Sequence, residues 1–398
     1  MTPAPRDFSF RRLVASSISV KILADIANQL FNPFLPIFAV GMGLDVVTLG
    51  RLVGLRSAMG IFSPLAGAMA DRQGYRRVMQ VALLLGAMGN LLLALSGMIW
   101  VTAAGLVLLG LGMGAFVPTL QAYVSYKLPN NQRARGIAMV EYSWPLTGIF
   151  GLFFIGLLIQ ATSWRAPFFL LAAGMGVAAL FVGTWPPVRG SAVAAQELVH
   201  SRSDNQAWLT FFDLGSHSRS IYACISFGAL TYFAAMQIMI SHGAWLQREY
   251  GLMPAQLGTV ALIFGFFDLA ASVSVSLFTD RIGAQRAVIG GAICALLAYL
   301  ALPFLNLNLW LVVAGLGIAR SCFEFTLVSY FSLLSEQSPD QRGKVMTISS
   351  AAALIGATVA GFTGPWMVVN TGIMPLVLSS AGVMVVALGL LLGFVRER

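Results

Sequence analysis

The chain has 398 residues, of which 58% are apolar and only 10% are charged, and its net charge is +9. A water-soluble protein covers its surface with roughly 25% charged residues, so this composition excludes a soluble globular domain and predicts a protein embedded in lipid. The positive charge does not indicate a nucleic-acid-binding protein, because the basic residues lie in short polar breaks between apolar runs, as they do in the loops of membrane proteins.

The first apolar run, residues 13–40, is interpreted as a membrane span rather than a cleaved leader. It exceeds the roughly 7–15 apolar residues of a signal-peptide core and lacks a convincing small-residue cleavage site. A span needs about 20 mostly apolar residues. By that criterion the chain has twelve spans, at 13–40, 48–70, 78–98, 100–126, 136–160, 165–185, 219–242, 256–279, 286–305, 308–334, 345–368 and 374–394.

A polar stretch separates the sixth predicted span from the seventh and divides the chain into two parts. We predict an N-terminal bundle at 1–189, a linker at 190–218 and a C-terminal bundle at 219–398. The predicted fold class is all-α and integral to the membrane, with two six-helix bundles.

Most lysines and arginines fall on one side of the predicted membrane, and the other side holds only Arg51, Arg165 and Arg248. Cytoplasmic loops carry the excess of basic residues. The richer side, both termini and the linker are therefore predicted to be cytoplasmic, in a multi-pass protein of a bacterial inner membrane. The basic residues of that side are Arg6, Arg11, Arg12, Arg72, Arg76, Arg77, Lys127, Arg133, Arg135, Arg189, Arg202, Arg219, Arg281, Arg286, Arg342, Lys344, Arg396 and Arg398.

The two halves also repeat short sequence patterns at nearly one spacing. The segment DRQG at 71–74 returns as DRIG 209 residues later, and TLQAYVS at 119–125 returns as TLVSYFS after 207 residues. The pair Arg135-Gly136 returns as Arg342-Gly343, again after 207 residues. Such a duplication is typical of transporters whose halves are related by an axis along the membrane normal.

The loop between the second and third spans reads GAMADRQGYRR over residues 67–77. It resembles the diagnostic loop of the major facilitator superfamily, and the weaker copy at 280–286 lies where that family has its second one. The resemblance implies a cavity lined by spans one, four, seven and ten, and a latch between the Asp71 loop and span eleven. In that loop Gly67 would allow a close helix approach and Gly74 a tight turn. The gating residues implied are Gly67, Asp71, Arg72, Gly74, Arg76 and Arg77, with Asp280, Arg281 and Gly283 in the second copy.

Seven ionisable residues lie inside predicted spans, where each costs at least ~2.5–3.5 kcal/mol if it faces lipid. They should therefore face the interior of the bundle or a water-filled cavity. They are Lys21, Asp25, Arg56, Glu141, Asp268, Arg320 and Glu324.

Span one carries a polar stripe at helical spacing, which predicts a cavity lining. Its members are Lys21, Asp25, Asn28, Gln29 and Asn32. Pro33 and Pro36 should allow this span to bend near its outer end. We predict Asp25 to be the acid that couples protons or contacts the solute, and the alternative is an intrahelical pair with Lys21 that only makes insertion tolerable.

Span ten repeats the pattern, since Arg320 and Glu324 are four residues apart and predict a second pair facing the cavity. Asp268 and Arg56 could pair with these groups or with each other. Structural pairing is the favoured role of Arg56 and Glu141, although Glu141 could also serve the gate near the Asp280 loop. Weaker cavity candidates are Gln121, Tyr232 and Gln237, since a polar residue in a span is often only a helix–helix hydrogen bond.

The sequence departs from the exporters of this superfamily in two places. Many of them carry an arginine in span four ahead of a Gly-x-Gly-Ala segment, and this chain has that segment at 112–115 but Leu108 at the position of the arginine. The proline-glycine signature of antiporters is only partial, in the segment 144–148. Both departures weaken the exporter interpretation. The segment GFTGP at 361–365 should give span eleven a flexible bend.

The function expected from these features is proton-coupled export of a small amphiphilic or drug-like molecule by alternating access. The alternative is uptake of a sugar or an organic anion, with which the basic residues Lys21, Arg56 and Arg320 are compatible. Expected partners are the lipid bilayer, a small-molecule solute and protons, with no nucleic acid, and the protein is expected to act as a monomer.

An enzyme or a channel is a more distant alternative. No HExxH segment, clustered histidines or nucleotide-binding loop occurs, since His200 and His217 lie in the linker and His242 at the outer end of span seven. The cysteines Cys224, Cys294 and Cys322 stand singly, without the spacing of a metal site. We therefore expect no enzymatic activity, no metal and no cofactor, with a proton gradient as the energy source.

Overall fold

The computed structural model describes residues 9–188, 214, 218–337 and 342–395, without the side chains of 130, 134, 276–280, 342 and 343. All secondary structure in these residues is helical. The N-terminal bundle contains α1 (Phe10–Gln29), α2 (Phe31–Gly41), α3 (Val46–Ala58), the 3-10 turn η1 (Met59–Phe62), α4 (Ser63–Gln73), α5 (Tyr75–Ala94), α6 (Ile99–Lys127), α7 (Asn130–Glu141), α8 (Ser143–Leu146), the π-helical segment η2 (Thr147–Leu152), α9 (Phe153–Ala161) and α10 (Ala166–Gly183). The C-terminal bundle contains α13 (Ser218–Tyr250), α14 (Pro254–Ile282), α15 (Ala284–Leu305), α16 (Leu309–Gln337), α17 (Arg342–Asn370) and α18 (Ile373–Phe394).

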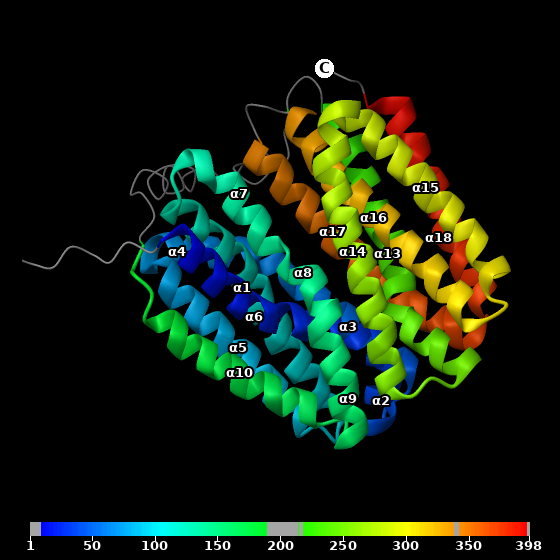
Figure 1. Ribbon diagram of the computed structural model, residues 1–398, viewed down its shortest axis with the longest axis horizontal. Helices are drawn as coiled ribbons and strands as arrows, with labels where there is room; N and C mark the ends of the chain where they lie inside the picture. The colour runs from blue at the N-terminus through cyan, green and yellow to red at the C-terminus, as the bar shows by residue number, and fades with distance from the viewer. Residues whose placement is uncertain (1–8, 189–213, 215–217, 338–341, 396–398) are drawn as a thin grey trace, which may run out of the picture.

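Figure 1 shows the two bundles side by side, the first coloured blue to green and the second yellow-green to red. Eleven helices of the described chain are long and apolar enough to cross a membrane, and the bent pair α1–α2 makes a twelfth span. The prediction of twelve spans in an all-α membrane fold is therefore confirmed. The predicted linker lies outside the described residues except for 214 and 218.

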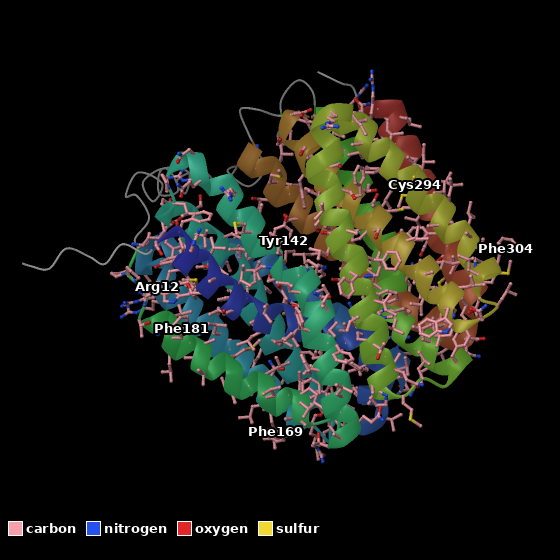
Figure 2. The ribbon with its side chains drawn as sticks, in the orientation of Figure 1. Arg12, Tyr142, Phe169, Phe181, Cys294 and Phe304 are labelled. Carbon is pink, nitrogen blue, oxygen red and sulfur yellow. The ribbon has the colours of Figure 1, made fainter. Side chains whose placement is uncertain are left out.

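Large apolar side chains cover the outside of the bundle, where lipid is the solvent. Phe169, Phe181 and Phe304 point away from the protein at its periphery in Figure 2, and they are 44%, 44% and 74% exposed. In water such a surface would drive aggregation. In hydrocarbon it carries no penalty, so the side chains that need an explanation are the polar ones inside.

The first span is broken by 58° between α1 and α2. Proline has no N–H, so Pro33 cannot donate to the carbonyl of Gln29, and Pro36 cannot donate to that of Asn32. The helix therefore breaks at Leu30, three residues before the first of these prolines. The predicted bend is confirmed. It lies at Leu30, which is closer along the chain to Asp25 than Pro33 is.

The turn between α2 and α3 is closed by Asp45, which caps α3. Its carboxylate accepts hydrogen bonds from the Thr48 hydroxyl (2.6 Å) and the Thr48 backbone N–H (2.9 Å). These two bonds hold the pKa of Asp45 below its ordinary value, and the bond from the Thr48 hydroxyl has the larger effect.

Glycines bring the two bundles into contact at three crossings. A Cβ on Gly361 of α17 would lie 2.6 Å from the Cα of Gly54 in α3. In the same way Gly148 faces Gly265 at 2.9 Å, and Gly156 faces Gly258 at 2.9 Å, which joins η2 and α9 to α14. Only glycine permits so close an approach of two helix backbones. Each crossing therefore excludes any larger residue while the bundles stay closed at this level.

The contacts between the bundles are uneven along the membrane normal. We call the end that carries Arg72, Arg281 and Lys344 the basic end. At that end α4 and α7 pack chiefly against helices of their own bundle, whereas the glycine crossings lie toward the opposite end. Among the described residues, the two bundles therefore meet toward the opposite end, whereas at the basic end α4 and α7 pack within their own bundle.

Of the expected latch, the side chains at the start of α17, at 342 and 343, lie outside the described residues. A Cβ on Gly67 would meet no described atom within 4 Å, so the predicted close approach at Gly67 is wrong in this structure. Asp71 accepts a hydrogen bond from Tyr75 of its own bundle at 2.5 Å. Arg76 donates to the carbonyl of Trp185 at 3.1 Å, and Arg72 and Arg77 are exposed.

The second copy of the loop repeats the turn of the first. Gly74 has φ +93°, which confirms the tight turn predicted there, and Gly283 has φ +89° at the equivalent position of the second copy. Arg281 is exposed, and the side chain of Asp280 lies outside the described residues. The expected bend at Pro365 does not interrupt α17, which runs unbroken from Arg342 to Asn370.

Candidate functional site

Lys21 is the centre of a buried cluster in the N-terminal bundle, 2% exposed. Its ammonium donates to the carboxylates of Asp25 at 3.0 Å and Glu141 at 3.1 Å, and to the hydroxyl of Ser143 at 3.0 Å. An ammonium has three N–H donors, so these three acceptors use all of them. We call Lys21, Asp25, Glu141 and Ser143 the Lys21 cluster.

The carboxylates of the cluster differ in their access to water. Asp25 is 2% exposed and accepts a second hydrogen bond, from the Ser143 hydroxyl at 2.5 Å. The Glu141 side chain is 44% exposed and accepts from Gln121 of α6 at 2.9 Å. With both carboxylates ionised the cluster carries one net negative charge. It can therefore take up one proton and become neutral, which costs less in a low-dielectric site than adding a charge.

Arg56 of α3 does not pair with a carboxylate among the described residues. It donates to the backbone carbonyls of Ala27 and Asn28 at 3.0 Å each, and lies over the ring of Phe31, 5.6 Å from its centroid. These carbonyls belong to the turn where α1 breaks. Arg56 thus ties the broken turn of the first span to the second through backbone carbonyls, and not through the charge pairing favoured from the sequence.

We expect Arg56→Met to lower the thermal stability of the purified protein. Loss of the guanidinium leaves two carbonyls at the break without this donor, which costs about 1–3 kcal/mol when such groups are buried. Thermal unfolding in detergent, followed by tryptophan fluorescence, measures the change. Arg51→Met is the matched control, because Arg51 lies on the same helix and is exposed. Equal melting temperatures of the two variants would contradict this role.

The C-terminal bundle contains one buried ion pair in its described part, between α14 and α16. Arg320 donates to Asp268 through two nitrogens, at 3.2 and 2.5 Å, and lies 5.3 Å from the centroid of the Phe264 ring. The sequence left the partners of Arg320 open between Glu324, four residues away, and Asp268, and the structure pairs Arg320 with Asp268. A two-bond fork to Asp268 is a stronger interaction than a single contact along one helix.

Glu324 makes no hydrogen bond or ion pair with any side chain that the structure describes. The charged groups that interact with it electrostatically come from both bundles: Lys21 and Glu141 from the first, Asp268 and Arg320 from the second. Glu324 is therefore within electrostatic range of charged groups of both bundles. It is only partly buried.

The remaining predicted residues divide between this space and the helix packing. Tyr232 packs edge-on against Phe323, with ring centroids 5.8 Å apart, and interacts electrostatically with Glu324 and Arg56. Gln237 bonds to Thr363 at 3.0 Å and accepts from Ser379 at 2.9 Å, so it joins α13, α17 and α18. Asn28 is partly exposed, whereas Asn32 is buried beyond the break.

Glu141 belongs to the Lys21 cluster. Its two oxygens accept from Lys21 and Gln121, both within its own bundle, which agrees with the structural pairing favoured from the sequence. The side chain of Asp280 lies outside the described residues, so a role of Glu141 at that loop stays a prediction.

Sequence reasoning missed Ser143 and His242. Ser143 contacts Asp25 across 118 positions of the chain, and no local pattern indicates such a contact. His242 was treated as a residue at the outer end of its span, yet it is 3% exposed, packs edge-on against Phe264 and interacts electrostatically with Arg320. The available sequence signal was its neighbour Gly243, since a glycine within a span can mark a close helix approach. In the structure Gly243 lies against the backbone carbonyls of Asn32 and Pro33.

Together these groups can hold and release protons between two bundles that meet at one end. The described residues contain no group of three or more histidine, cysteine or carboxylate side chains that could hold a metal ion. The arrangement is therefore suited to acid–base exchange coupled to a movement of the bundles.

Comparison with known sequences gives a family match over nearly the whole chain. The pattern described as Major Facilitator Superfamily matches residues 18–244 and 223–398. The uncharacterized MFS-type transporter YwfA of Bacillus subtilis is 27% identical over 366 residues, which cover 89% of this chain and 86% of that protein. The multidrug resistance protein MdtG of Yersinia enterocolitica is 30% identical over 198 residues, which cover 48% of this chain and 46% of that protein.

Solved structures share the architecture at low sequence identity. The D-xylose-proton symporter superposes with a TM-score of 0.77 at 16% identity, over 98% of this chain and 99% of that one. At this identity the likeness concerns the fold alone.

Proposed function

The chain belongs to the major facilitator superfamily of membrane transporters, and from that premise we propose that it exports a small drug-like or amphiphilic molecule in exchange for protons. It is a multi-pass membrane protein that acts on a small molecule. The finer parts of the proposal are the direction, the coupling ion and the kind of solute.

The observation that carries the proposal is the sharing of Lys21 between the carboxylates of Asp25 and Glu141. One ammonium cannot neutralise two carboxylates, so one proton balances the cluster. Protonation of Asp25 leaves Lys21 to Glu141 and weakens the hydrogen bond that Ser143 donates to Asp25. Ser143 lies in α8, directly before η2, and η2 forms the Gly148–Gly265 crossing with the other bundle. A change in the cluster is thus passed to the contact between the bundles.

The uneven contact between the bundles supports alternating access. We propose that the basic end is cytoplasmic, by the positive-inside rule, and that both termini lie on that side of a bacterial inner membrane. The conformation described is then open to the cytoplasm and closed outside. Rocking of one bundle about the glycine crossings would close the basic end and form the Asp71 latch. We propose a monomer as the working unit and the proton gradient as the only energy source, without a cofactor.

The likeness to MdtG, a multidrug resistance protein, supports export, while the likeness to the D-xylose-proton symporter concerns only the fold. Export and uptake differ in the relative direction of protons and solute. An exporter moves its solute against the flow of protons, and a symporter moves both together.

The test uses purified protein in proteoliposomes with an acidic interior. We expect outward proton flow to drive uptake of the dye ethidium into these liposomes, and nigericin, which collapses the gradient, to abolish it. Liposomes without protein give the background. Movement of preloaded D-xylose or tartrate out of the liposomes together with the protons, with no movement of ethidium, would indicate a symporter that takes up its solute instead of an exporter.

A further inference from the structure

The helix α14 begins at a residue whose side chain cannot cap it. Met253 is the N-cap residue, because its carbonyl accepts the first bond of the helix, from the N–H of Leu257 at 3.0 Å. An N-cap side chain normally accepts a hydrogen bond from the second or third N–H of the helix. Methionine has only a weakly accepting sulfur. The N–H of Ala255, the second helical residue after Pro254, therefore needs an acceptor from elsewhere.

That acceptor comes from the other bundle. The Oε1 atom of Gln160, in the last turn of α9, accepts from the Ala255 N–H at 3.0 Å. In the same turn of α14, the Gln256 side chain accepts from the Met253 N–H at 2.8 Å. Together these bonds take the place of the two bonds of a capping box, which normally both come from one helix. Half of the cap of α14 is thus supplied by the N-terminal bundle.

The bond between Ala255 and Gln160, which we call the Gln160 cap, lies at the end opposite the basic one. α14 runs to Ile282 at the basic end, so its start lies at the other end. There α9 and the start of α14 are side by side (Figure 1), and Gly156 meets Gly258 one turn farther into both helices. A bond of this length is lost when its two helices separate by a few ångströms. The Gln160 cap therefore exists only while the bundles are closed at this end.

We propose that Gln160 is a gating residue whose bond to α14 stabilises the conformation that is closed at this end. When the bundles part there, the Ala255 N–H loses the glutamine, and α14 begins with an incomplete cap. The cost of that loss falls only on the conformation that is open at this end, so Gln160 shifts the equilibrium between the two conformations. This role rests on the alternating access of the proposed function, and it requires neither a particular solute nor a particular coupling ion.

Spin labels at the same end of both bundles measure this equilibrium. Met98 and Leu307 are 70% and 80% exposed and can carry the labels, in a full-length chain whose three native cysteines are replaced. Double electron–electron resonance in nanodiscs, without solute or pH gradient, gives the ratio of the populations at longer and shorter label distances. We expect Gln160→Leu to raise this ratio at least about threefold, as for the loss of an N-cap acceptor. Gln132→Leu, the same change at an exposed glutamine of the basic end, should leave it unchanged.

A cap supplied by α14 itself separates loss of the cap from loss of packing. Met253→Ser places a hydroxyl at the N-cap, where serine is a preferred residue, and this cap is present in both conformations. Met253→Ser alone should therefore raise the ratio as Gln160→Leu does, and the double variant should raise it no further. If the glutamine acts only by packing, its replacement should have the same effect in either background.

Two outcomes would overturn the gating role of Gln160. They are an equal ratio in the wild type and Gln160→Leu, and an equal effect of Gln160→Leu with and without Met253→Ser. A melting curve for each variant checks that it is folded. Should Gln160→Leu fail to fold, an unchanged ratio in Met253→Ser would overturn the gating role instead.

The transport assay separates this proposal from the proposed function. If Gln160→Leu changes the ratio while a pH gradient moves no ethidium in wild-type proteoliposomes, the Gln160 cap stands and proton-driven export falls. If the wild type moves ethidium and the ratio is the same in both proteins, export stands and the gating role of Gln160 falls.

Discussion

Proteoliposomes that contain Asp25→Asn should lose uptake driven by a pH gradient, down to the level of protein-free liposomes, while the variant still inserts and folds. Asparagine keeps the shape of the side chain and an oxygen that can accept from Lys21 and Ser143. It cannot take up or release a proton. Transport driven by a solute gradient alone should persist, because that movement does not require the cluster to titrate.

The loss should be large because Asp25 is the one buried carboxylate that pairs with Lys21 among the described residues. Asp25 is 2% exposed, whereas the side chain of Glu141 is 44% exposed. Removing the Asp25 carboxylate leaves Lys21 balanced by Glu141 alone, so the cluster is neutral without a proton. The energetic link between proton binding and the bundle contact then disappears.

Two variants serve as controls for Asp25→Asn. Asp25→Glu retains a carboxyl group and should keep part of the response to the gradient. Glu336→Gln removes an exposed acid of α16 and should keep all of it. Proton-driven uptake that is unchanged in Asp25→Asn would move the coupling role to another acid, with Glu324 as the next candidate.

The membrane-spanning fold could be predicted from the sequence because it depends on local properties. Hydrophobic length alone locates a span, and every predicted span overlaps a helix of the structure. The turns at Gly74 and Gly283 were also predictable, since a conformation with positive φ suits glycine. The break of the first span follows from Pro33 and Pro36. Its position at Leu30 depends on the carbonyl of Gln29, to which Pro33 has no N–H to donate.

The partners of the charged residues could not be predicted, because they depend on how each helix is rotated and which helix lies beside it. Lys21 reaches Glu141 over 120 positions, and Arg320 reaches Asp268 over 52. The spacing of Arg320 and Glu324 permits a pair along one helix, yet the rotation of α16 turns the arginine toward α14. Sequence spacing shows which side chains can share a face, and packing decides which of them bond.

The latch at the basic end illustrates a different limit. A transporter that alternates has at least two sets of contacts, and one sequence encodes both. The resemblance of the Asp71 loop to the family implies a latch between the bundles at the basic end, whereas in the structure Asp71 accepts from Tyr75 of its own bundle. The latch contact of Asp71 and its hydrogen bond from Tyr75 can then belong to two different conformations of the same chain.

The largest effect on stability is expected from Arg320→Gln. This change leaves the Asp268 carboxylate without its partner, and its side chain is only 5% exposed. Removing one member of a buried ion pair typically costs about 3–5 kcal/mol. We therefore expect a clear fall in the melting temperature of the detergent-purified protein, followed by tryptophan fluorescence. Arg281→Gln, which removes an exposed arginine, should melt like the wild type.

The double variant Asp268→Asn/Arg320→Gln shows whether the loss comes from an unpaired charge or from packing around Phe264. If the unpaired charge is the cause, the double variant should recover much of the melting temperature, because two neutral amides can bond to each other and neither carries a charge to desolvate. If the packing of Arg320 on the ring is the cause, the double variant should melt as low as the single one. Recovery would mean that α14, which carries Gly258 and Gly265 at the bundle contact, is held in place by charge neutralisation. A single variant as stable as the wild type would contradict the role of this pair altogether.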